Sequence, residues 1–515
     1  MAGHWKPILA IVVITLMVYW PTLGHDFLHA WDDDVYVMQN PLVNSKSPID
    51  VKRILLTSVN GVYSPLTVLS FSVEHKLFGQ VPFYFHLDNV LLHILVCILL
   101  FQLAMMLGLS VTGAFLGATL FAVHPMHVES VAWISERKDV LYSTFYLLAL
   151  LQYIVYTRTA NRWHFILSVI FGFLSMLAKP MALSLPLVLL LLDHFLERRR
   201  SWIERINEKI WYWLFIVPLA FCSLWSVGQS QGALMQAILL WIFSFVFYIK
   251  KFFVPDVFLP HYELPQPVIV AHPVYMGAVL VFAVLLYVII RFKAARWFMF
   301  AWGFFFLSIF FLLRIGNVMS IQNVANLSQV ADRFMYLPSA GFCLWAGFLA
   351  QEALNGKTRK IGAFMIVGIL VFLSARTFVQ VQVWKDDTVL WTHAINHAPQ
   401  DPLGYINRAS SFMFKGDQDK AIADYTRAMQ IDSGAYVSDL ASKFPHLNKE
   451  QLAEANVTNT LLLNNPYYVV ALRGRARVYF MAKDIAAARA DCDATLRIGP
   501  EDNDMKALAR LVAGR

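Results

Sequence analysis

The sequence predicts an all-α protein: a polytopic helical membrane domain over residues 1–378, followed by a domain of helical repeats over 379–515. Composition is the first reason. Of 515 residues 58% are hydrophobic and only 15% are charged, with 40 Phe and 15 Trp, which is not the composition of a soluble domain. The other two reasons are a series of long apolar runs and a recurrence of residues after position 379.

Eleven apolar runs are long enough to cross a hydrocarbon core of ~30 Å. They cover residues 7–23, 87–108, 111–124, 139–157, 163–178, 181–196, 211–228, 272–291, 297–315, 336–354 and 361–378. The Lys and Arg clusters between them are typical of cytoplasmic loops, and these cannot all lie inside if 233–254 crosses as well. We therefore expect 233–267 to be an interfacial or re-entrant segment, with the N-terminus inside and the repeats outside.

Three consecutive carboxylates, Asp32, Asp33 and Asp34, directly follow the first apolar run. Like charges this close disfavour joint ionisation, so at least one pKa should be raised, as a general base requires. A solvated turn or an acidic helix start remains the alternative. The outer loop 24–86 also contains two amphipathic pieces, which we expect to lie on the membrane surface and enclose this site.

Four cations stand at helix ends on the outer side, where Lys and Arg are disfavoured in short loops: Arg137, Lys138, Lys179 and Arg333. Each is a candidate anion ligand, and snorkelling to lipid headgroups is the alternative for each. The basic clusters elsewhere set membrane orientation, so the net charge of +8 does not indicate a nucleic-acid partner.

Two histidines and a glutamate lie within six residues, at His124, His127 and Glu129. They could ligate a metal, but Pro125 disrupts the helical spacing that would align them, so a hydrogen-bonded cluster is at least as well supported. The four cysteines give no disulfide or zinc framework. We expect no cofactor, with a divalent cation at these three residues as the alternative.

The C-terminal domain repeats itself. Trp391 and Ala394 recur 34 residues later as Tyr425 and Ala428, and four further residues recur 67 positions on: Asp417, Ala421, Asp424 and Ile431 as Asp484, Ala488, Asp491 and Ile498. A period near 34 predicts a tetratricopeptide-type α-solenoid of three to four hairpins, degenerate over 435–465. Such a stack offers a groove for a protein or peptide, and a purely stabilising appendage is the alternative.

Several blocks together resemble the transmembrane and tetratricopeptide-repeat O-mannosyltransferases and their bacterial relatives, in the GT-C glycosyltransferase superfamily. The blocks are Trp31-Asp32-Asp33 with Tyr36, Tyr63-Ser64-Pro65, His124-Pro125-x-His127-x-Glu129 with Arg137-x-Asp139, Lys179-Pro180, and Asp332-Arg333-Phe334-x-Tyr336. The resemblance implies a GT-C-type membrane domain that takes a sugar from a polyprenyl-phosphate carrier. The repeat array is shorter than in the animal enzymes, which puts the animal acceptor in doubt.

The resemblance also implies roles. A carboxylate takes the proton of the acceptor hydroxyl, and neighbouring residues point apart, so only one of Asp32 and Asp33 can face the donor; Asp33 is preferred as base, with Asp32 second. Arg137, Lys179 and Arg333 would stabilise the leaving phosphate, and Asp139 would pair with Arg137. Supporting residues are His124, His127, Glu129, Asp139 and Tyr336.

The expected activity is inverting transfer of a mannose-like hexose to Ser or Thr hydroxyls of proteins on the outer face of a membrane. The sequence has no Gly-rich nucleotide-binding loop after a strand, which agrees with a lipid-linked donor. A GT-C enzyme acting on a lipid-linked glycan or surface polysaccharide, and a non-catalytic repeat scaffold, remain alternatives. We expect a bacterial cytoplasmic membrane with the repeats in the periplasm, and the endoplasmic reticulum second.

Overall fold

The computed structural model describes residues 4–198, 201–215, 234–291, 296–310, 330–443 and 466–514, and these are almost entirely helical. The membrane-domain helices are α1 (Trp5–Tyr19), α4 (Pro82–Met106), α5 (Val111–Ala122), α6 (Val128–Ala132), α7 (Arg137–Thr159), α8 (Arg162–Ala178), α9 (Leu185–Phe195), α10 (Trp202–Glu208), α12 (Leu234–Phe253), α13 (Pro273–Arg291), α14 (Arg296–Ile309), α15 (Ser339–Asn355) and α16 (Arg359–Val383). The outer loop adds α2 (Val51–Leu56) and α3 (Pro65–Phe78).

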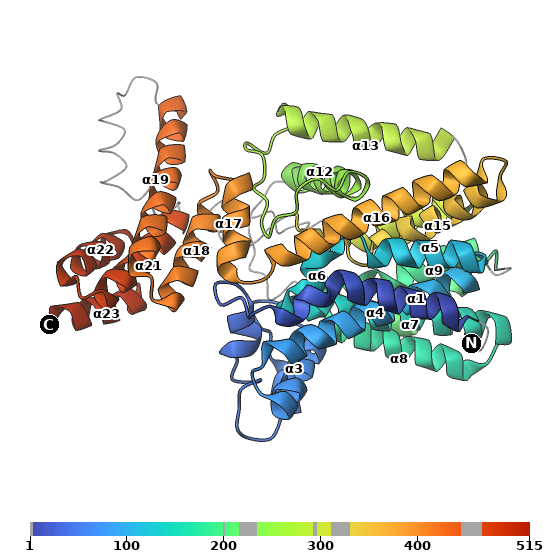
Figure 1. Cartoon of the computed structure of the whole chain (residues 1–515), viewed down its shortest axis with the longest axis horizontal. Helices are drawn as coiled ribbons and strands as arrows, with labels where there is room; N and C mark the ends of the chain where they lie inside the picture. Colours follow the sequence, from blue (N-terminus) through green and yellow to red (C-terminus); the bar gives the residue numbers. More distant parts are fainter. Residues whose placement is uncertain are drawn as a thin grey trace.

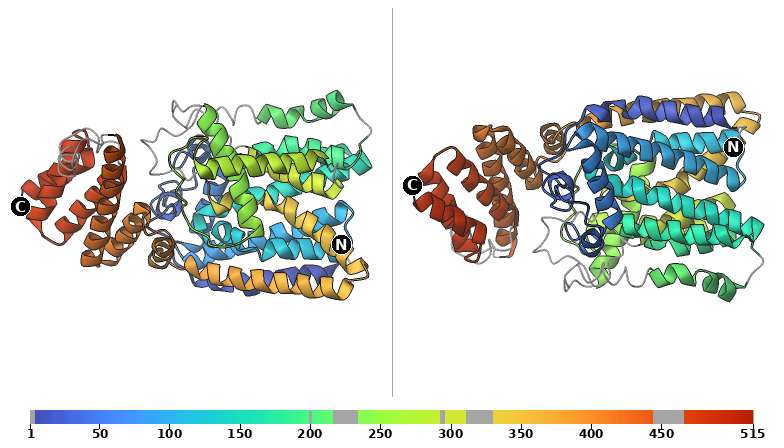
Figure 2. Two further views of the ribbon diagram at one scale, coloured as in Figure 1. Left: turned by 90° about the horizontal axis from the view of Figure 1, so that it is seen from above. Right: turned by 90° about the horizontal axis from the view of Figure 1, so that it is seen from below.

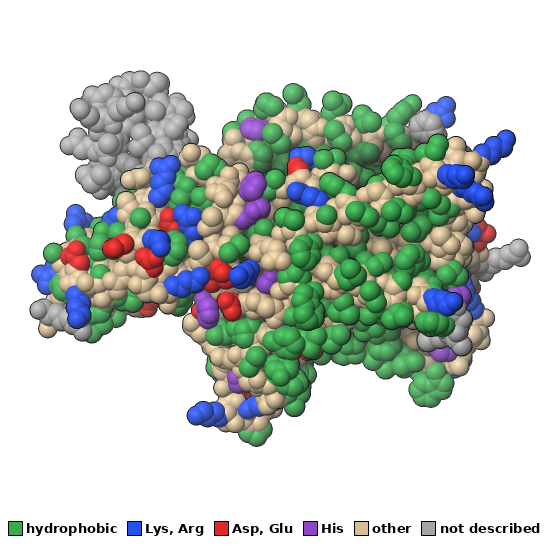
Figure 3. All heavy atoms as spheres, viewed as in Figure 1, with side chains coloured by type: hydrophobic (Ala, Val, Ile, Leu, Met, Phe, Trp, Pro, Cys, Tyr) green, Lys and Arg blue, Asp and Glu red, His purple; other side chains and the backbone are tan. Residues whose placement is uncertain are grey.

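The long helices α1, α4, α7, α8 and α16 run side by side as a bundle (Figures 1 and 2). The chain starts at one end of this bundle, and the C-terminal helices lie beyond the other end. Hydrophobic side chains cover the sides of the bundle, while Lys and Arg gather at the end where α15 meets α16 (Figure 3). This surface is that of an integral, multi-pass membrane protein.

Five helical stretches in the described part of the chain are long and apolar enough to span a membrane, or six if the pair α5 and 125–132, bent by 52°, counts as one. Four further apolar helices are shorter: Arg162–Ala178, Pro180–Phe195, Pro273–Ile289 and Arg296–Ile309. The eleven spans expected from hydropathy are therefore not confirmed, because hydropathy does not register where a helix breaks. The expected run 211–228 and part of 297–315 lie outside the described residues.

Helix α12 fills most of the segment predicted to be interfacial or re-entrant. It is among the five candidate spans by length and composition. It nevertheless runs across the direction of α16 and is seen almost end-on in Figure 1. The interfacial placement of 233–267 thus remains a prediction, with the orientation of α12 in its favour.

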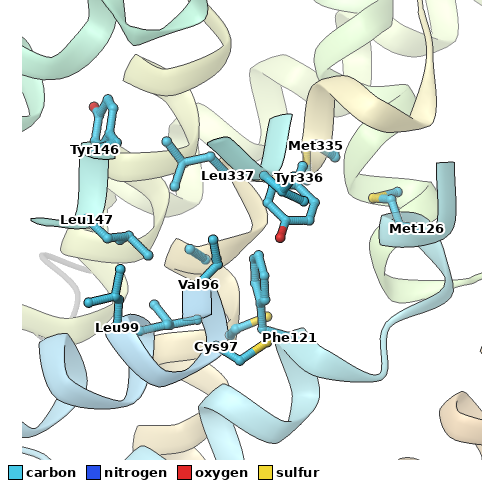
Figure 4. Close-up of a cluster of buried hydrophobic side chains, with 14 of the residues drawn as sticks. Val96, Cys97, Leu99, Phe121, Met126, Tyr146, Leu147, Met335, Tyr336 and Leu337 are labelled. Atoms are coloured by element: carbon cyan, nitrogen blue, oxygen red, sulfur yellow. The ribbon is translucent and has the colours of Figure 1, made fainter. Parts of the chain in front are cut away.

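Small residues allow α5 and α15 to pack closely. A methyl group on Gly117 would lie 2.8 Å from the carbonyl oxygen of Cys343, and one on Gly113 would lie 3.0 Å from that of Gly347. Such contacts between backbones replace the hydrophobic driving force that is missing between helices in lipid. Beside this contact, Phe121 of α5 packs edge-to-face on Tyr336, with ring centroids 5.2 Å apart (Figure 4).

The outer loop folds back over the bundle end. Tyr36, Phe71, Phe85 and Ile134 are fully buried in one apolar cluster that ties α3 to α4 and to the start of α7. On its other face α3 exposes Val73, Leu77 and Phe78, the amphipathic pattern expected for a membrane-surface helix.

Six helices follow α16 in the described part: α17 (Asp387–His397), α18 (Pro402–Lys415), α19 (Gln418–Lys443), α21 (Pro466–Met481), α22 (Ile485–Ile498) and α23 (Asn503–Ala513). Arg408 bonds both carboxylate oxygens of Asp424 (2.7 and 2.9 Å), and 67 residues on, Arg475 does the same to Asp491 (2.8 and 2.9 Å). The recurrence is thus a repeated ion pair. The tetratricopeptide class remains a prediction, and most of the degenerate unit 435–465 lies outside the described residues.

Candidate active site

The two carboxylates preferred as base have different environments. Asp33 is buried, and three donors hold its carboxylate: the backbone N–H of Leu28 (2.9 Å) and the N–H and hydroxyl of Ser135 (2.9 and 2.5 Å). Burial raises the pKa of Asp33 to about 6, against the opposing effect of these hydrogen bonds. Asp33 therefore ties the acidic loop to the turn η4 (Ile134–Glu136) before α7.

Asp32 is partly exposed and accepts a hydrogen bond from the Asn60 side chain (3.1 Å). Burial raises its pKa above the ordinary value, the charges of Lys138 and Arg333 lower it, and that of Glu136 raises it. Asp32 lies near this charged group, since the next residue, Asp33, bonds Ser135, which directly precedes Glu136. A carboxylate with a raised pKa beside cations is the arrangement that base catalysis with an anionic leaving group needs.

Six ionisable side chains form this group, which we call the loop-side cluster: Glu129, Glu136, Asp139, Lys138, Lys179 and Arg333. Lys179 bonds Glu136 (3.0 Å) and Asp139 (2.7 Å). Arg333 donates to Glu129 from its guanidinium (2.5 Å) and its backbone N–H (2.9 Å). Lys138 pairs with Glu136 at 3.2 Å and lies over the Tyr36 ring. Three cations are thus held by three carboxylates, beside the fourth carboxylate of Asp32.

Arg137 does not join this cluster. It is 1% exposed and donates to Glu74 (2.5 Å), the Asn89 side chain (2.9 Å) and the carbonyl oxygen of Phe85 (2.9 Å). The predicted pairing of Asp139 with Arg137 is wrong, because residues two apart on a helix do not face each other; Asp139 pairs with Lys179 and Ser130 instead. Arg137 fixes α3 and α4 to the start of α7.

The histidines have separate partners rather than a common ligand. His124 Nε2 bonds the carbonyl oxygen of Phe252 (3.0 Å), while His127 bonds the carbonyl oxygen of Phe121 (2.7 Å) and the Ser339 hydroxyl (2.8 Å). Glu129 forms an ion pair with Arg333. No group of three His, Cys, Asp or Glu residues that could hold a metal occurs among the described residues. The centroids of the two imidazole rings lie 5.6 Å apart, but each ring bonds its own protein partners, as does Glu129.

Tyr336, expected to support the site, is fully buried beneath it. Its hydroxyl bonds His93 Nδ1 (2.7 Å), and its ring packs on His127 with centroids 5.3 Å apart. Glu136 is the member of the cluster that the sequence reasoning missed. Its signal is the run Glu136-Arg137-Lys138-Asp139, four consecutive charged residues at the mouth of an apolar run, a placement that is costly unless the charges are used.

Comparison with known proteins finds protein O-mannosyl-transferases among the relatives of this chain. The chain is 34% identical over 200 residues to protein O-mannosyl-transferase TMTC1 of Mus musculus, which is 35% of this chain and 21% of that protein. It is 24% identical over 489 residues to protein O-mannosyl-transferase F38B6.6 of Caenorhabditis elegans, which is 83% of this chain and 63% of that protein. The chain is a distant homologue of these O-mannosyl-transferases. It spans about a fifth of the mouse relative's length. No protein-family model matches it.

Among solved structures, a similar one is the crystal structure of ArnT from Cupriavidus metallidurans bound to undecaprenyl phosphate. The alignment covers 96% of this chain and 80% of that one, with 11% identity and a TM-score of 0.38.

Proposed function

We propose that this protein is a GT-C-type membrane glycosyltransferase that moves a mannose-like hexose from a polyprenyl-phosphate carrier to Ser or Thr hydroxyls of proteins. One observation carries the proposal: Asp32, a partly exposed carboxylate with a raised pKa, lies beside the loop-side cluster, because its neighbour Asp33 bonds Ser135 next to Glu136. Its support from outside the structure is the homology to protein O-mannosyl-transferases.

In the proposed reaction Asp32 takes the proton of the acceptor hydroxyl while that oxygen attacks the anomeric carbon. The bond from this carbon to the phosphate oxygen breaks, and the configuration inverts. Lys138 and Arg333 stabilise the charge that develops on the phosphate, and preorganised cations in a site shielded from water are suited to this. Lys179 holds Glu136 and Asp139, and Glu136 in turn pairs with Lys138 and Arg333.

This assignment reverses the order preferred from the sequence. Asp33 is the less suitable base, because all three of its donors already occupy its oxygens. Arg137 is likewise replaced by Lys138 as a phosphate ligand, because its guanidinium is enclosed by Glu74, Asn89 and two phenyl rings. Arg333 keeps its predicted role at the phosphate, whereas Lys179 pairs with Glu136 and Asp139 and so supports the site instead.

The orientation supports the same proposal. The bundle end that gathers Lys and Arg lies opposite the end that holds the acidic loop and the C-terminal helices (Figures 1 and 3). By the positive-inside rule the active site then faces the outer side, where the C-terminal helices would meet protein acceptors. In a bacterium this side is the periplasm.

The test is transfer by the purified full-length protein in lipid nanodiscs, with radiolabelled polyprenyl-phosphate hexoses as donors and the host's periplasmic proteins as acceptors. The expected result is protease-sensitive label with wild type, lost in Asp32→Asn and kept in Asp34→Asn, since Asp34 bonds His29 and Gln39 instead. Label confined to lipid-extractable glycan would favour the polysaccharide alternative. No transfer from any such donor would overturn the proposal.

A further inference from the structure

The first C-terminal helix touches the acidic loop directly. The Asp387 carboxylate, at the start of α17, accepts hydrogen bonds from the backbone N–H groups of His29 (2.9 Å) and Ala30 (3.1 Å). Asp387 is 4% exposed, and the carbonyl oxygen of Lys385 accepts from the N–H of Asp26 (3.0 Å). Loop amides that are buried without a partner are costly, so these bonds fix the path of residues 26–30.

An aromatic contact continues this attachment. Trp391, one turn further along α17, is fully buried, and its ring lies 4.9 Å from that of Trp31, edge-to-face. Trp31 in turn lies 5.9 Å from Trp133, which precedes η4. Trp31 is therefore enclosed between the membrane domain and α17, and it is the residue next to Asp32 in the chain.

Asp32 is thus placed from two sides. On the membrane side, Asp33 bonds Ser135 and the N–H of Leu28. On the other side, Asp387 bonds the two amides that follow Leu28, and Trp391 packs on Trp31. No other carboxylate accepts from the amides of His29 and Ala30 among the described residues, so this half of the support comes from the C-terminal domain.

We propose that Asp387 and Trp391, which we call the α17 clamp, are positioning residues that hold Asp32 in place for proton abstraction. The proposal rests on the function proposed above. It makes the C-terminal helices part of the frame of the active site in addition to any role in binding acceptors. Helix α17 packs on α18, and α18 packs on α19. A protein bound to these helices would therefore affect the position of the loop that carries Asp32.

The size of the effect follows from the sensitivity of catalysis to position. A displacement of about 1 Å at a reacting group can lower the rate about 100-fold. In Asp387→Asn only one side-chain oxygen remains to accept a hydrogen bond from the amides of His29 and Ala30. The new NH₂ group then faces one of these N–H donors without being able to accept from it. We expect kcat to fall at least about tenfold, with KM for the donor little changed because the cations stay in place.

The experiment compares four full-length proteins in nanodiscs: wild type, Asp387→Asn, Trp391→Leu and Asp386→Asn. Asp386 is the matched control, because its side chain caps α17 at Thr388 and Val389, a role that Asn fills equally well. Each protein is assayed for kcat, for donor KM and for amide hydrogen exchange in a peptide that covers residues 25–33. Exchange reports whether the clamp holds the loop, independently of activity.

The expected result is faster exchange of the loop peptide together with lower kcat in both clamp variants, and neither change in the control. Faster exchange with unchanged kcat would overturn the inference, and so would unchanged exchange in both clamp variants. A fall confined to donor binding would overturn it too, since the clamp would then serve the phosphate site. If wild type itself transfers no sugar, the proposed function fails. If wild type is active and the clamp variants behave like it, only the present inference fails and the proposed function stands.

Discussion

Helix α7 has a buried charge network near each end, and the two differ in what they connect. Near its far end Tyr153 meets what we call the far-end cluster: Asp193, Arg198, Glu208 and Lys209. Arg198 bonds Asp193 (3.0 Å) and Glu208 (2.6 Å), and Lys209 bonds the same two acids. The Tyr153 hydroxyl lies within hydrogen-bond distance of both carboxylates (2.8 and 2.9 Å) and donates to one of them. The two acidic and two basic side chains of this cluster, all from residues 193–209, therefore pair with one another.

The loop-side cluster at the start of α7 draws on residues from 129 to 333 and lies beside a carboxylate from the first loop. Its acids hold its cations, but Asp32 adds a fourth carboxylate whose partner among the described residues is the uncharged Asn60. A closed, neutral network supports a fold, whereas one with a partly exposed carboxylate at its edge can act on a ligand.

The largest effect is expected at Asp32. Asp32→Asn should lower kcat about 10²- to 10⁴-fold, the usual contribution of a general base, while the melting temperature stays close to wild type. Asp33→Asn should instead lower the melting temperature, because it weakens hydrogen bonds to a buried charge, worth about 1.5–3 kcal/mol each. Transfer assays and thermal unfolding of both variants distinguish a loss of catalysis from a loss of stability. The reverse result would restore Asp33 as the base.

Next come the cations. Lys138→Met should lower kcat/KM for the donor about 10²- to 10³-fold, because one preorganised charge at the leaving phosphate is removed. Lys250→Met is the control: this exposed lysine on α12 pairs with Asp256. Steady-state kinetics with varied donor concentration measure the effect. Equal losses in both variants would mean that Lys138 acts through bulk charge only.

At the far-end cluster the expected effect is on stability. Lys209→Met leaves Asp193 buried with one cation fewer, and breaking a buried pair costs about 3–5 kcal/mol. The variant should melt at a lower temperature, yet its turnover per folded molecule should stay within about twofold of wild type. Thermal unfolding in detergent, with activity normalised to folded protein, checks this. A stable but inactive variant would contradict the distinction between the clusters.

The smallest effect is a shift of the pH profile. Activity should rise with pH as Asp32 ionises, with an apparent pKa above the ordinary aspartate value. Lys138 lowers this pKa and Glu136 raises it, so Lys138→Met should move the acid limb to higher pH and Glu136→Gln should move it to lower pH. Profiles of log kcat/KM against pH measure both. Shifts of the same sign would exclude Asp32 as the titrating base.

Composition and hydropathy determined the class of this protein, because lipid leaves few structures other than apolar helices that satisfy the backbone. Several parts of the proposed site could also be picked out in the sequence: the acidic loop after the first apolar run, and four cations at helix ends, of which Lys138, Lys179 and Arg333 lie in the loop-side cluster. The recurrence of residues 67 positions apart could also be recognised in the sequence. In the structure it corresponds to two equivalent ion pairs, Arg408 with Asp424 and Arg475 with Asp491.

Only the tertiary structure decided which member of each neighbouring pair faces the site. Arg137 and Lys138 are adjacent, yet successive side chains on a helix point about 100° apart, so one binds Glu74 and the other Glu136. Asp32 and Asp33 differ in the same way. The bond from Asp387 to His29 joins residues 358 positions apart, and no local pattern encodes such a contact, because it forms only when the loop and α17 meet at the end of the bundle.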